Sequence, residues 1–174
     1  PFLSKTFPVK FANFNINNKP LTCFEFDPKK INCVYAGSLI NDQIRDPSFF
    51  FEVAKELKNT NLVFHMICYH LPEKRLNEYK AALGDTNNVL WYDSLPFEEC
   101  KEIIANADLL INISNRVNNQ TPSKVFDYIG TGLPIVNFYC LKDDTSKKYL
   151  ANYPYKINIF EDCNNTTVSA ELLY

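Results

Sequence analysis

The sequence lacks an apolar run of the roughly 18 residues that a membrane-spanning helix needs. It also lacks the charged and then apolar opening of a secretory signal peptide, and it contains no Cys-x-x-Cys pair. Only two histidines occur, His65 and His70, and neither stands at ligand spacing from a cysteine, so no metal site is expected. We interpret the six cysteines as buried, reduced thiols of a cytoplasmic protein.

Three catalytic or nucleotide-binding signatures are missing as well. There is no G-x-G-x-x-G, no G-x-x-x-x-G-K-[ST] and no G-x-S-x-G, which argues against a dinucleotide fingerprint, a P-loop and a hydrolase nucleophile elbow. Eighteen Lys and Arg nearly balance twenty Asp and Glu, so composition gives no general attraction to nucleic acid. With 174 residues, 46% of them hydrophobic, the chain can bury the core of one ordinary domain.

From residue 31 onward, short apolar runs alternate with helical patterns. This alternation is typical of βαβ units, and the continuous apolar runs indicate strands that are covered on both faces. We therefore predict an α/β fold: a Rossmann-like, doubly wound parallel sheet of about six strands. The predicted strands are 31–36, 62–68, 89–92, 108–113, 134–138 and 156–160.

The predicted helices begin where a capping residue meets a proline or where an apolar face starts. Asp46-Pro47, Pro96 and Thr121-Pro122 open three of them. The helix after Pro96 is expected to face inward with Phe97, Cys100, Ile103 and Ile104. A second helix should end near Gly84, a short polar one should cover 145–150, and a last one should begin after Thr166 or Thr167.

Residues 1–30 break this pattern. Their scattered Phe, Pro and Asn suggest a linker or an incoming segment, so the domain is predicted to span 31–174. Because the chain opens at Pro1, we expect a fragment or a processed chain.

Two polar loops are predicted to meet at the switch point of the sheet. With strand order 3-2-1-4-5-6, this point lies between the first and fourth strands, and ligands bind there at the carboxyl ends. The loops are 37–46 and 114–122, and each leads into a helix N-terminus, where backbone N–H groups attract anions. Arg45 and Lys124 add one cation each, with Arg116 nearby, so the crevice suits a phosphate or diphosphate.

Each of these residues also has a structural interpretation. Gly37 could be a turn glycine, Arg45 a solvated surface residue, and Thr121 and Ser123 caps of a helix. Asp127 could pair with Lys124 or accept hydrogen bonds from sugar hydroxyls.

Four other polar residues also have both a structural and a functional interpretation. His65 lies within an apolar strand and reads as a core histidine, whereas His70 could line the crevice. Asp42 and Asp46 could hold a metal but are more simply loop and cap residues.

The segment 120–136, QTPSKVFDYIGTGLPIV, resembles the donor-site motif of the B-fold nucleotide-sugar glycosyltransferases. The resemblance is to the retaining, group 1 or family 4-like kind that is common in capsule, lipopolysaccharide and exopolysaccharide synthesis. The segment 34–39, VYAGSL, followed by Arg45, is similar to that family's glycine loop and phosphate-binding cation. In order and spacing the resemblance covers about residues 31–160.

The resemblance implies roles for individual residues, with no bound metal or other cofactor, because protein cations and helix N-termini neutralise the leaving diphosphate. Asp127 stands where the family has Glu, Asn119 where many members have an earlier Glu, and Tyr69-His70 where the family has a glycine loop. Catalytic residues are not identified. The implied diphosphate-binding residues are Gly37, Ser38, Arg45, Thr121, Ser123 and Lys124; those for the ribose and sugar are Asp127, Asn119 and Gln120; those near the base are Trp91, Tyr92 and Asp93.

The resemblance is to the C-terminal, donor-binding half of a two-domain enzyme. It implies a nucleotide-sugar donor and an acceptor half upstream that binds a saccharide or lipid-linked acceptor. The isolated chain is then expected to bind donor without multiple turnover, and the parent to be cytoplasmic, with peripheral attachment to the inner membrane face left open. Two alternatives remain: a non-catalytic nucleotide- or partner-binding module of the same fold, and a nucleotide-sugar 2-epimerase.

Overall fold

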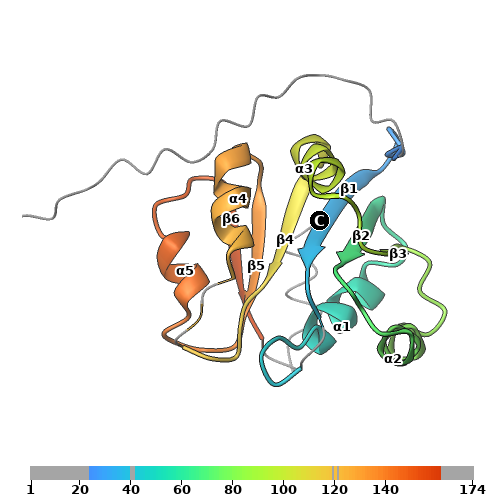
Figure 1. The fold of residues 1–174 in the computed structure, drawn as a ribbon, viewed down its shortest axis with the longest axis horizontal. Helices are drawn as coiled ribbons and strands as arrows, with labels where there is room; N and C mark the ends of the chain where they lie inside the picture. The colour runs from blue at the N-terminus through green and yellow to red at the C-terminus, as the bar shows by residue number, and fades with distance from the viewer. Residues whose placement is uncertain (1–23, 40–41, 119, 121, 162–174) are drawn as a thin grey trace, which may run out of the picture.

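Six strands form one parallel sheet, in the order that the sequence predicts (Figure 1). The computed structural model describes residues 24–39, 42–118, 120 and 122–161. The order is β3-β2-β1-β4-β5-β6, so the direction of winding reverses between β1 and β4. The strands are β1 (Ile31–Gly37), β2 (Leu62–Cys68), β3 (Val89–Tyr92), β4 (Leu109–Ile113), β5 (Ile135–Tyr139) and β6 (Lys156–Phe160).

Five helices connect these strands within the described residues, as in a doubly wound fold. Asp46 does not cap α1 directly. Its Oδ1 instead accepts bonds from the backbone N and the hydroxyl of Ser48, at 2.9 and 2.6 Å, and closes the turn before the helix. The helix predicted after Thr166 lies outside the described residues. The helices are α1 (Ser48–Glu56), α2 (Glu73–Leu83), α3 (Phe97–Asn106), α4 (Lys124–Thr131) and α5 (Thr145–Tyr149).

The apolar strands are continuous because helices cover both faces of the sheet. Along β1, Cys33 and Tyr35 face the core beneath α1 and α2, whereas Val34 and Ala36 face the core beneath α3 and α4. Successive side chains of a strand point to opposite faces, so both sets must be apolar. Figure 1 shows α3 and α4 together on one side of the sheet.

Phe97 is a correction to the predicted inward face of α3. Ile103 and Ile104 are buried as predicted, but Phe97 is 60% exposed and Cys100 is half-buried. The reason is position. Phe97 begins α3 directly after the loop that follows β3, so the first turn of the helix lies at the carboxyl end of the sheet and not over it.

Residues 24–30 lie before β1, in the segment predicted as a linker. Phe24 packs against His65 and Tyr92, with ring centroids 5.3 and 4.8 Å apart, and Phe26 packs against His65 at 5.1 Å. This part of the segment therefore contributes to the core, and the domain boundary at residue 31 stays a prediction.

We expect Phe50→Ala to lower the free energy of unfolding by about 3–5 kcal/mol. Phe50 is buried on α1, and its ring lies 5.2 Å from Phe64 and 5.5 Å from Phe138, so truncation leaves a cavity between helix and sheet. Urea denaturation measures the change. Phe160→Ala is the matched control, because this ring is half-exposed on β6; an equal loss in both variants would contradict the packing described.

Candidate functional site

The candidate site lies where β1 and β4 separate. The two strands pair only at Cys33–Leu109 and Val34–Leu110, whereas β1 pairs with β2 along its whole length. Beyond Val34, the Tyr128 hydroxyl on α4 lies 2.9 Å from the backbone nitrogen of Ala36 and accepts its hydrogen bond. On its β4 side, the end of β1 is therefore held by a helix side chain and not by strand pairing. We refer to this divergence of β1 and β4 at the predicted switch point as the crevice.

Arg45 bridges the two sides of this crevice. Its Nε and Nη2 donate to Asn115 Oδ1, two residues after the end of β4, at 3.2 and 2.8 Å. Its Nη1 donates to the Ser38 carbonyl oxygen at 2.9 Å and to the Tyr35 hydroxyl at 3.3 Å, both on the β1 side. The sequence places Arg45 and Ser38 in the site, and the structure brings them into contact, Ser38 through its backbone.

The charge of Arg45 meets only neutral oxygens among the described residues. No carboxylate there forms an ion pair with it, and its hydrogen-bond acceptors there are an amide, a carbonyl and a phenol. Burial raises the pKa of Tyr35 to about 12, although Arg45 lowers it, so the phenol keeps its proton. A half-buried guanidinium without a counter-charge is an electrostatic site for an anion.

The Tyr35 hydroxyl lies so close to residue 37 that only glycine fits there. A Cβ at this position would lie 2.9 Å from the Tyr35 hydroxyl and 3.4 Å from Arg45 Nη1. A side chain at position 37 would therefore clash with the Tyr35 phenol, which accepts a hydrogen bond from Arg45.

Asn115 connects Arg45 to the loop before α4. Its Nδ2 donates to the Gln120 carbonyl oxygen at 2.9 Å, while its Oδ1 accepts from Arg45. The sequence did not predict Asn115 and Tyr35 as site residues. Both lie in stretches that are polar or contain glycine, but nothing in their spacing separates them from neighbouring residues.

The N-terminus of α4 faces the same crevice. Ser123 is the N-cap by position and makes no side-chain capping bond, while the N–H groups of Val125 and Phe126 donate to the carbonyl oxygens of Pro122 and Ser123, both at 3.1 Å. Lys124 Nζ lies 3.6 Å from Asp127 Oδ2, the structural pairing that the sequence allowed, and the Asp127 side chain is 43% exposed. Asn119 and Thr121 lie outside the described residues.

A pocket of about 220 Å³ opens beside Lys124. Its walls come from the ends of β1 and β2, the loop after β3 and the first turn of α3, so it adjoins the crevice at Gly37. The lining residues are Ala36, Gly37, Ile67, Tyr69, Ser94, Leu95, Phe97, Cys100 and Lys124.

The three residues predicted near the base do not line this pocket. Trp91 packs against Phe51 and Tyr79, with ring centroids 5.9 and 6.0 Å apart, on the α1 and α2 face. Tyr92 bonds His65, and Asp93 Oδ1 accepts from the backbone of Ser94. With Cys68 and Leu76 these three residues line a separate hollow of about 350 Å³ beside α2.

The third cation of the loops, Arg116, is neutralised. Its Nη2 lies 2.9 Å from Asp46 Oδ2 and 3.2 Å from Glu161 Oε2. Burial raises the pKa of Glu161 to about 7, and Arg116 opposes this rise. Arg116 therefore positions the loop through Asp46, and its backbone N donates to the Ile44 carbonyl oxygen at 2.6 Å.

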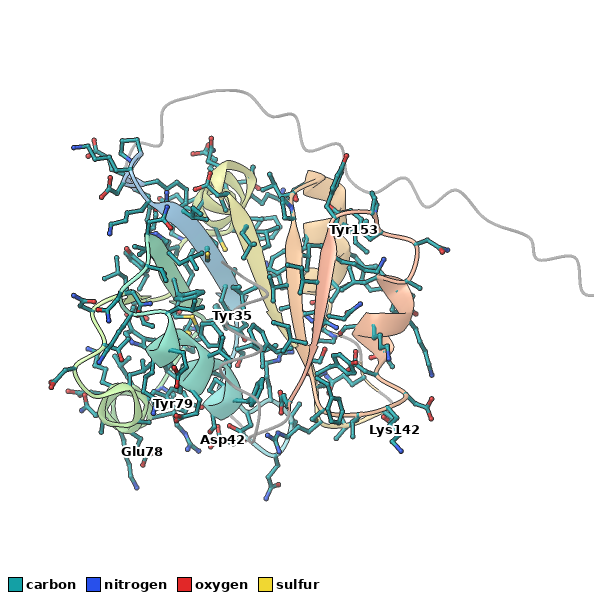
Figure 2. All side chains as sticks on the ribbon, turned by 180° about the vertical axis from the view of Figure 1, so that it is seen from behind. Tyr35, Asp42, Glu78, Tyr79, Lys142 and Tyr153 are labelled. Carbon is teal, nitrogen blue, oxygen red and sulfur yellow. The ribbon has the colours of Figure 1, made fainter. Side chains whose placement is uncertain are left out.

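Asp42 and Asp46, the two loop aspartates that could hold a metal, both bond to protein groups. Asp42 accepts from the Tyr79 hydroxyl at 2.6 Å and from Arg75 Nη1 at 2.7 Å, an anchor to α2 (Figure 2). In the part of the chain that the structure describes, no three His, Cys, Asp or Glu side chains gather as metal ligands would.

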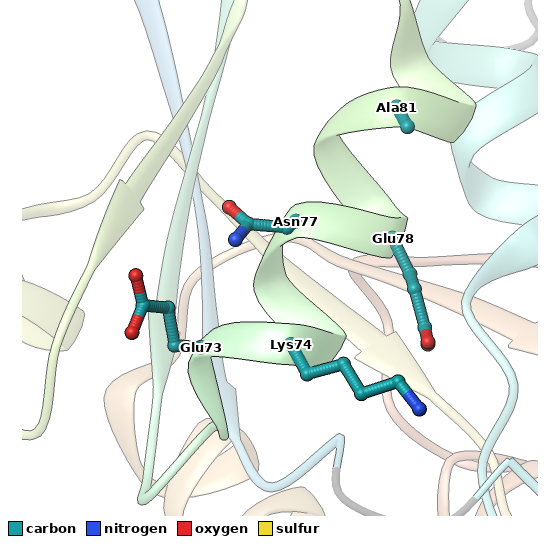
Figure 3. A pocket seen from close by; sticks show the side chains of 5 residues that line it. All are labelled: Glu73, Lys74, Asn77, Glu78 and Ala81. Carbon is teal, nitrogen blue, oxygen red and sulfur yellow. The ribbon is translucent and has the colours of Figure 1, made fainter.

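Another hollow, on the outer surface of α2, carries no convergent groups. Glu73, Lys74, Asn77, Glu78 and Ala81 line it, and all five belong to one helix (Figure 3). No second element closes over them, so this is a solvated helix face. Among the described helices, none has both the length and the apolarity to cross a membrane.

Comparison with known proteins gives structural but no sequence matches. No family model and no curated protein matches the chain. WaaG, a glycosyltransferase involved in lipopolysaccharide biosynthesis, matches with a TM-score of 0.63 and 17% identity over 84% of this chain. Anabaena HepE, solved with UDP-glucose, matches with a TM-score of 0.61 and 11% identity over 83% of it.

The chain has the fold of one domain of the B-fold glycosyltransferases. A Listeria monocytogenes protein described as a UDP-N-acetylglucosamine 2-epimerase shares this fold, with a TM-score of 0.57 and 13% identity over 87% of the chain. The B-fold domain spans 38% of the length of WaaG and of HepE and 40% of that of the epimerase.

The two histidines of this B-fold domain differ in their surroundings. His65 is buried in β2, with its ring nitrogens 3.1 Å from the Tyr92 hydroxyl and from Asn32 Oδ1, the core role that the sequence indicates. His70 follows β2 with a left-handed backbone, φ +48°, and its N–H donates to Ser94 Oγ beside the pocket.

We expect His65 to make the domain less stable in acid. Burial lowers the pKa of His65 from 6.5 to about 4, so between these values the unfolded chain binds a proton that the folded chain does not. Stability is then lost as the pH falls from about 6.5 to about 4, by up to about 3 kcal/mol relative to His65→Gln. Urea denaturation of both proteins at several pH values measures this difference. The titration of Glu161 contributes equally to the stability of both proteins, so it does not affect the difference. Parallel pH profiles would contradict the assignment.

Proposed function

We propose that the chain is the nucleotide-sugar donor-binding domain of a retaining glycosyltransferase. The observation that carries the proposal is Arg45, whose charge is held by neutral oxygens at the switch point of the sheet. A diphosphate supplies the anion that this guanidinium lacks. The motif resemblance of residues 120–136 and the B-fold architecture support the same assignment.

Sugar transfer leaves a nucleoside diphosphate with growing negative charge, and the enzyme must stabilise that charge. In the proposed complex, Arg45 and Lys124 bind the phosphate oxygens, and the positive end of the α4 dipole lies beside them. Gly37 leaves room for the Tyr35 hydroxyl, which holds the guanidinium in place. The protein then supplies the positive charge, so we propose that donor binding needs no metal ion.

Residues on both sides of Lys124 would bind the rest of the donor. Asp127 lies one turn further along α4 and would accept hydrogen bonds from the ribose hydroxyls. Asn119, Gln120 and Thr121 would approach the sugar and the phosphates from the loop before α4. HepE, a structural neighbour, was solved with UDP-glucose, which supports a nucleotide sugar as the ligand here.

The acceptor is proposed to bind in a second domain. Since the chain spans well under half of its structural neighbours, a saccharide or lipid-linked acceptor of polysaccharide synthesis would contact a domain outside it. Hexosyl transfer in the cytoplasm is the corresponding proposal for the parent enzyme.

The structural likeness to an epimerase favours one alternative, a nucleotide-sugar 2-epimerase. The two functions share the diphosphate site and differ in their products. Conversion of a nucleotide sugar into its C2 epimer would favour the epimerase, and transfer to an acceptor would favour the transferase.

We expect the chain to bind one of UDP, GDP and ADP in buffer with EDTA. Arg45→Ala combined with Lys124→Ala should lower that affinity by about 100-fold or more, because each cation makes charge-assisted hydrogen bonds to phosphate. Isothermal titration calorimetry measures both. The matched control is Lys142→Ala with Lys148→Ala, which removes two exposed cations outside the site and should leave the affinity unchanged.

Two results would contradict this prediction: equal losses in both double variants, or binding that appears only after a divalent cation is added. The first would indicate a general charge effect, and the second a metal-dependent site.

We also expect the isolated chain to give no multiple-turnover sugar transfer, because the acceptor-binding half is proposed to lie outside it. The measurement is nucleotide release with a nucleotide sugar and a saccharide or lipid-linked acceptor. Sustained release at many equivalents per chain would show that this domain suffices.

A further inference from the structure

Two adjacent residues after β4 hold three consecutive residues of the loop that carries Arg45. Asn115 Oδ1 accepts from the Arg45 side chain at 2.8 and 3.2 Å. The Arg116 backbone N donates to the Ile44 carbonyl oxygen at 2.6 Å, and Arg116 Nη2 lies 2.9 Å from Asp46 Oδ2. Arg116 therefore fixes the residues on both sides of Arg45.

Glu161 reaches Arg116 from the end of β6, an edge strand of the sheet. Its backbone N donates to the carbonyl oxygen of Tyr139, the last residue of β5, at 2.8 Å. Its side chain is 7% exposed, and its Oε2 lies 3.2 Å from Arg116 Nη2. Because its backbone is bonded to the sheet and its side chain is enclosed, Glu161 holds the guanidinium at a defined place.

This enclosed carboxyl group contributes position at a cost in stability. Burial raises the pKa of Glu161 from 4.5 to about 7, and the charges of Asp46 and Asp144 add to the rise, while Arg116 opposes it. A carboxyl group with a raised pKa is less stable as an anion in the folded chain than in the unfolded chain. Arg116 already has a counter-charge in Asp46, so Glu161 is not needed to neutralise it.

We propose that Glu161 is a positioning residue for Arg45. Glu161 fixes the Arg116 side chain, and Arg116 fixes the loop on both sides of the Arg45 guanidinium. The inference rests on the proposed function, because Arg45 is the residue proposed to bind the donor diphosphate. Ionised or protonated, the Glu161 carboxyl group presents an oxygen to Arg116, so the place of this oxygen matters more than its charge.

The test separates the place of the oxygen from the charge. Wild type and variants are titrated calorimetrically with inorganic pyrophosphate, UDP, GDP and ADP. Glu161→Ala removes the oxygen and should weaken binding about three- to tenfold, the contribution of one hydrogen bond. Glu161→Gln keeps an oxygen there without the charge and should stay within about twofold of wild type. Glu161→Asp keeps the charge but withdraws the oxygen, and should bind as weakly as Glu161→Ala.

The conservative pair keeps the test valid if the alanine variant does not fold, which urea denaturation of each variant establishes. The matched control is Glu52→Gln. It removes the carboxylate of an exposed ion pair with Lys55 on α1 and should leave every affinity unchanged.

A double variant tests whether Glu161 acts through Arg116. Arg116→Ala should also weaken binding of pyrophosphate. Adding Glu161→Ala should then weaken it no further, because the residue through which Glu161 acts is gone. Two independent structural effects would add instead, so additive losses would contradict a positioning role.

Two further results overturn the inference. If Glu161→Ala and Glu161→Asp bind as wild type does, the oxygen does not position the site. If Glu161→Gln binds as weakly as these two should, or more tightly than wild type by more than about twofold, the charge of Glu161 matters and not its place. A wild-type chain that binds neither pyrophosphate nor any of the nucleotides would overturn the proposed function itself.

Discussion

The early separation of β1 from β4 is the constraint on which the site depends. These strands pair at two positions only, so the backbone of Ala36 would lack a partner on the β4 side without the Tyr128 hydroxyl. Burial raises the pKa of this phenol well above its ordinary range, which keeps it protonated and neutral. The same contact fixes α4 against the end of β1. The position of Lys124 at the start of α4 follows from it.

Arg45 connects the loops that follow β1 and β4. Its guanidinium bonds the Ser38 carbonyl oxygen on one side and Asn115 on the other, and Asn115 continues to Gln120. Each of these oxygens is neutral, so the hydrogen-bonding groups are satisfied while the charge is not compensated. A carboxylate in place of Asn115 would satisfy the charge and remove the attraction for an anion. The site therefore combines a defined geometry with an available positive charge.

The fold could be predicted from the sequence more completely than the site. Continuous apolar runs and proline-marked helix starts carry local information, and they predicted the strands and their order correctly. The contacts of Arg45 with Tyr35 and Asn115 depend on where two strands part, which no local pattern encodes. The prediction that Phe97 faces inward was wrong for a related reason. Its spacing fits the inward face of a helix, but the helix begins where there is no sheet to cover.

Lys124 and Asp127 form an ion pair in the structure, and we propose that the same two residues bind the donor. Their charged atoms are 3.6 Å apart and both side chains are partly exposed, so the ion pair contributes at most about 1 kcal/mol. An arriving diphosphate carries more charge than one carboxylate and competes for the ammonium at little cost. The displaced Asp127 carboxylate then needs hydrogen-bond donors rather than a cation, and hydroxyl groups of a ribose supply them. A weak pair at this helix start is therefore compatible with donor binding, whereas a buried, tightly bonded pair would oppose it.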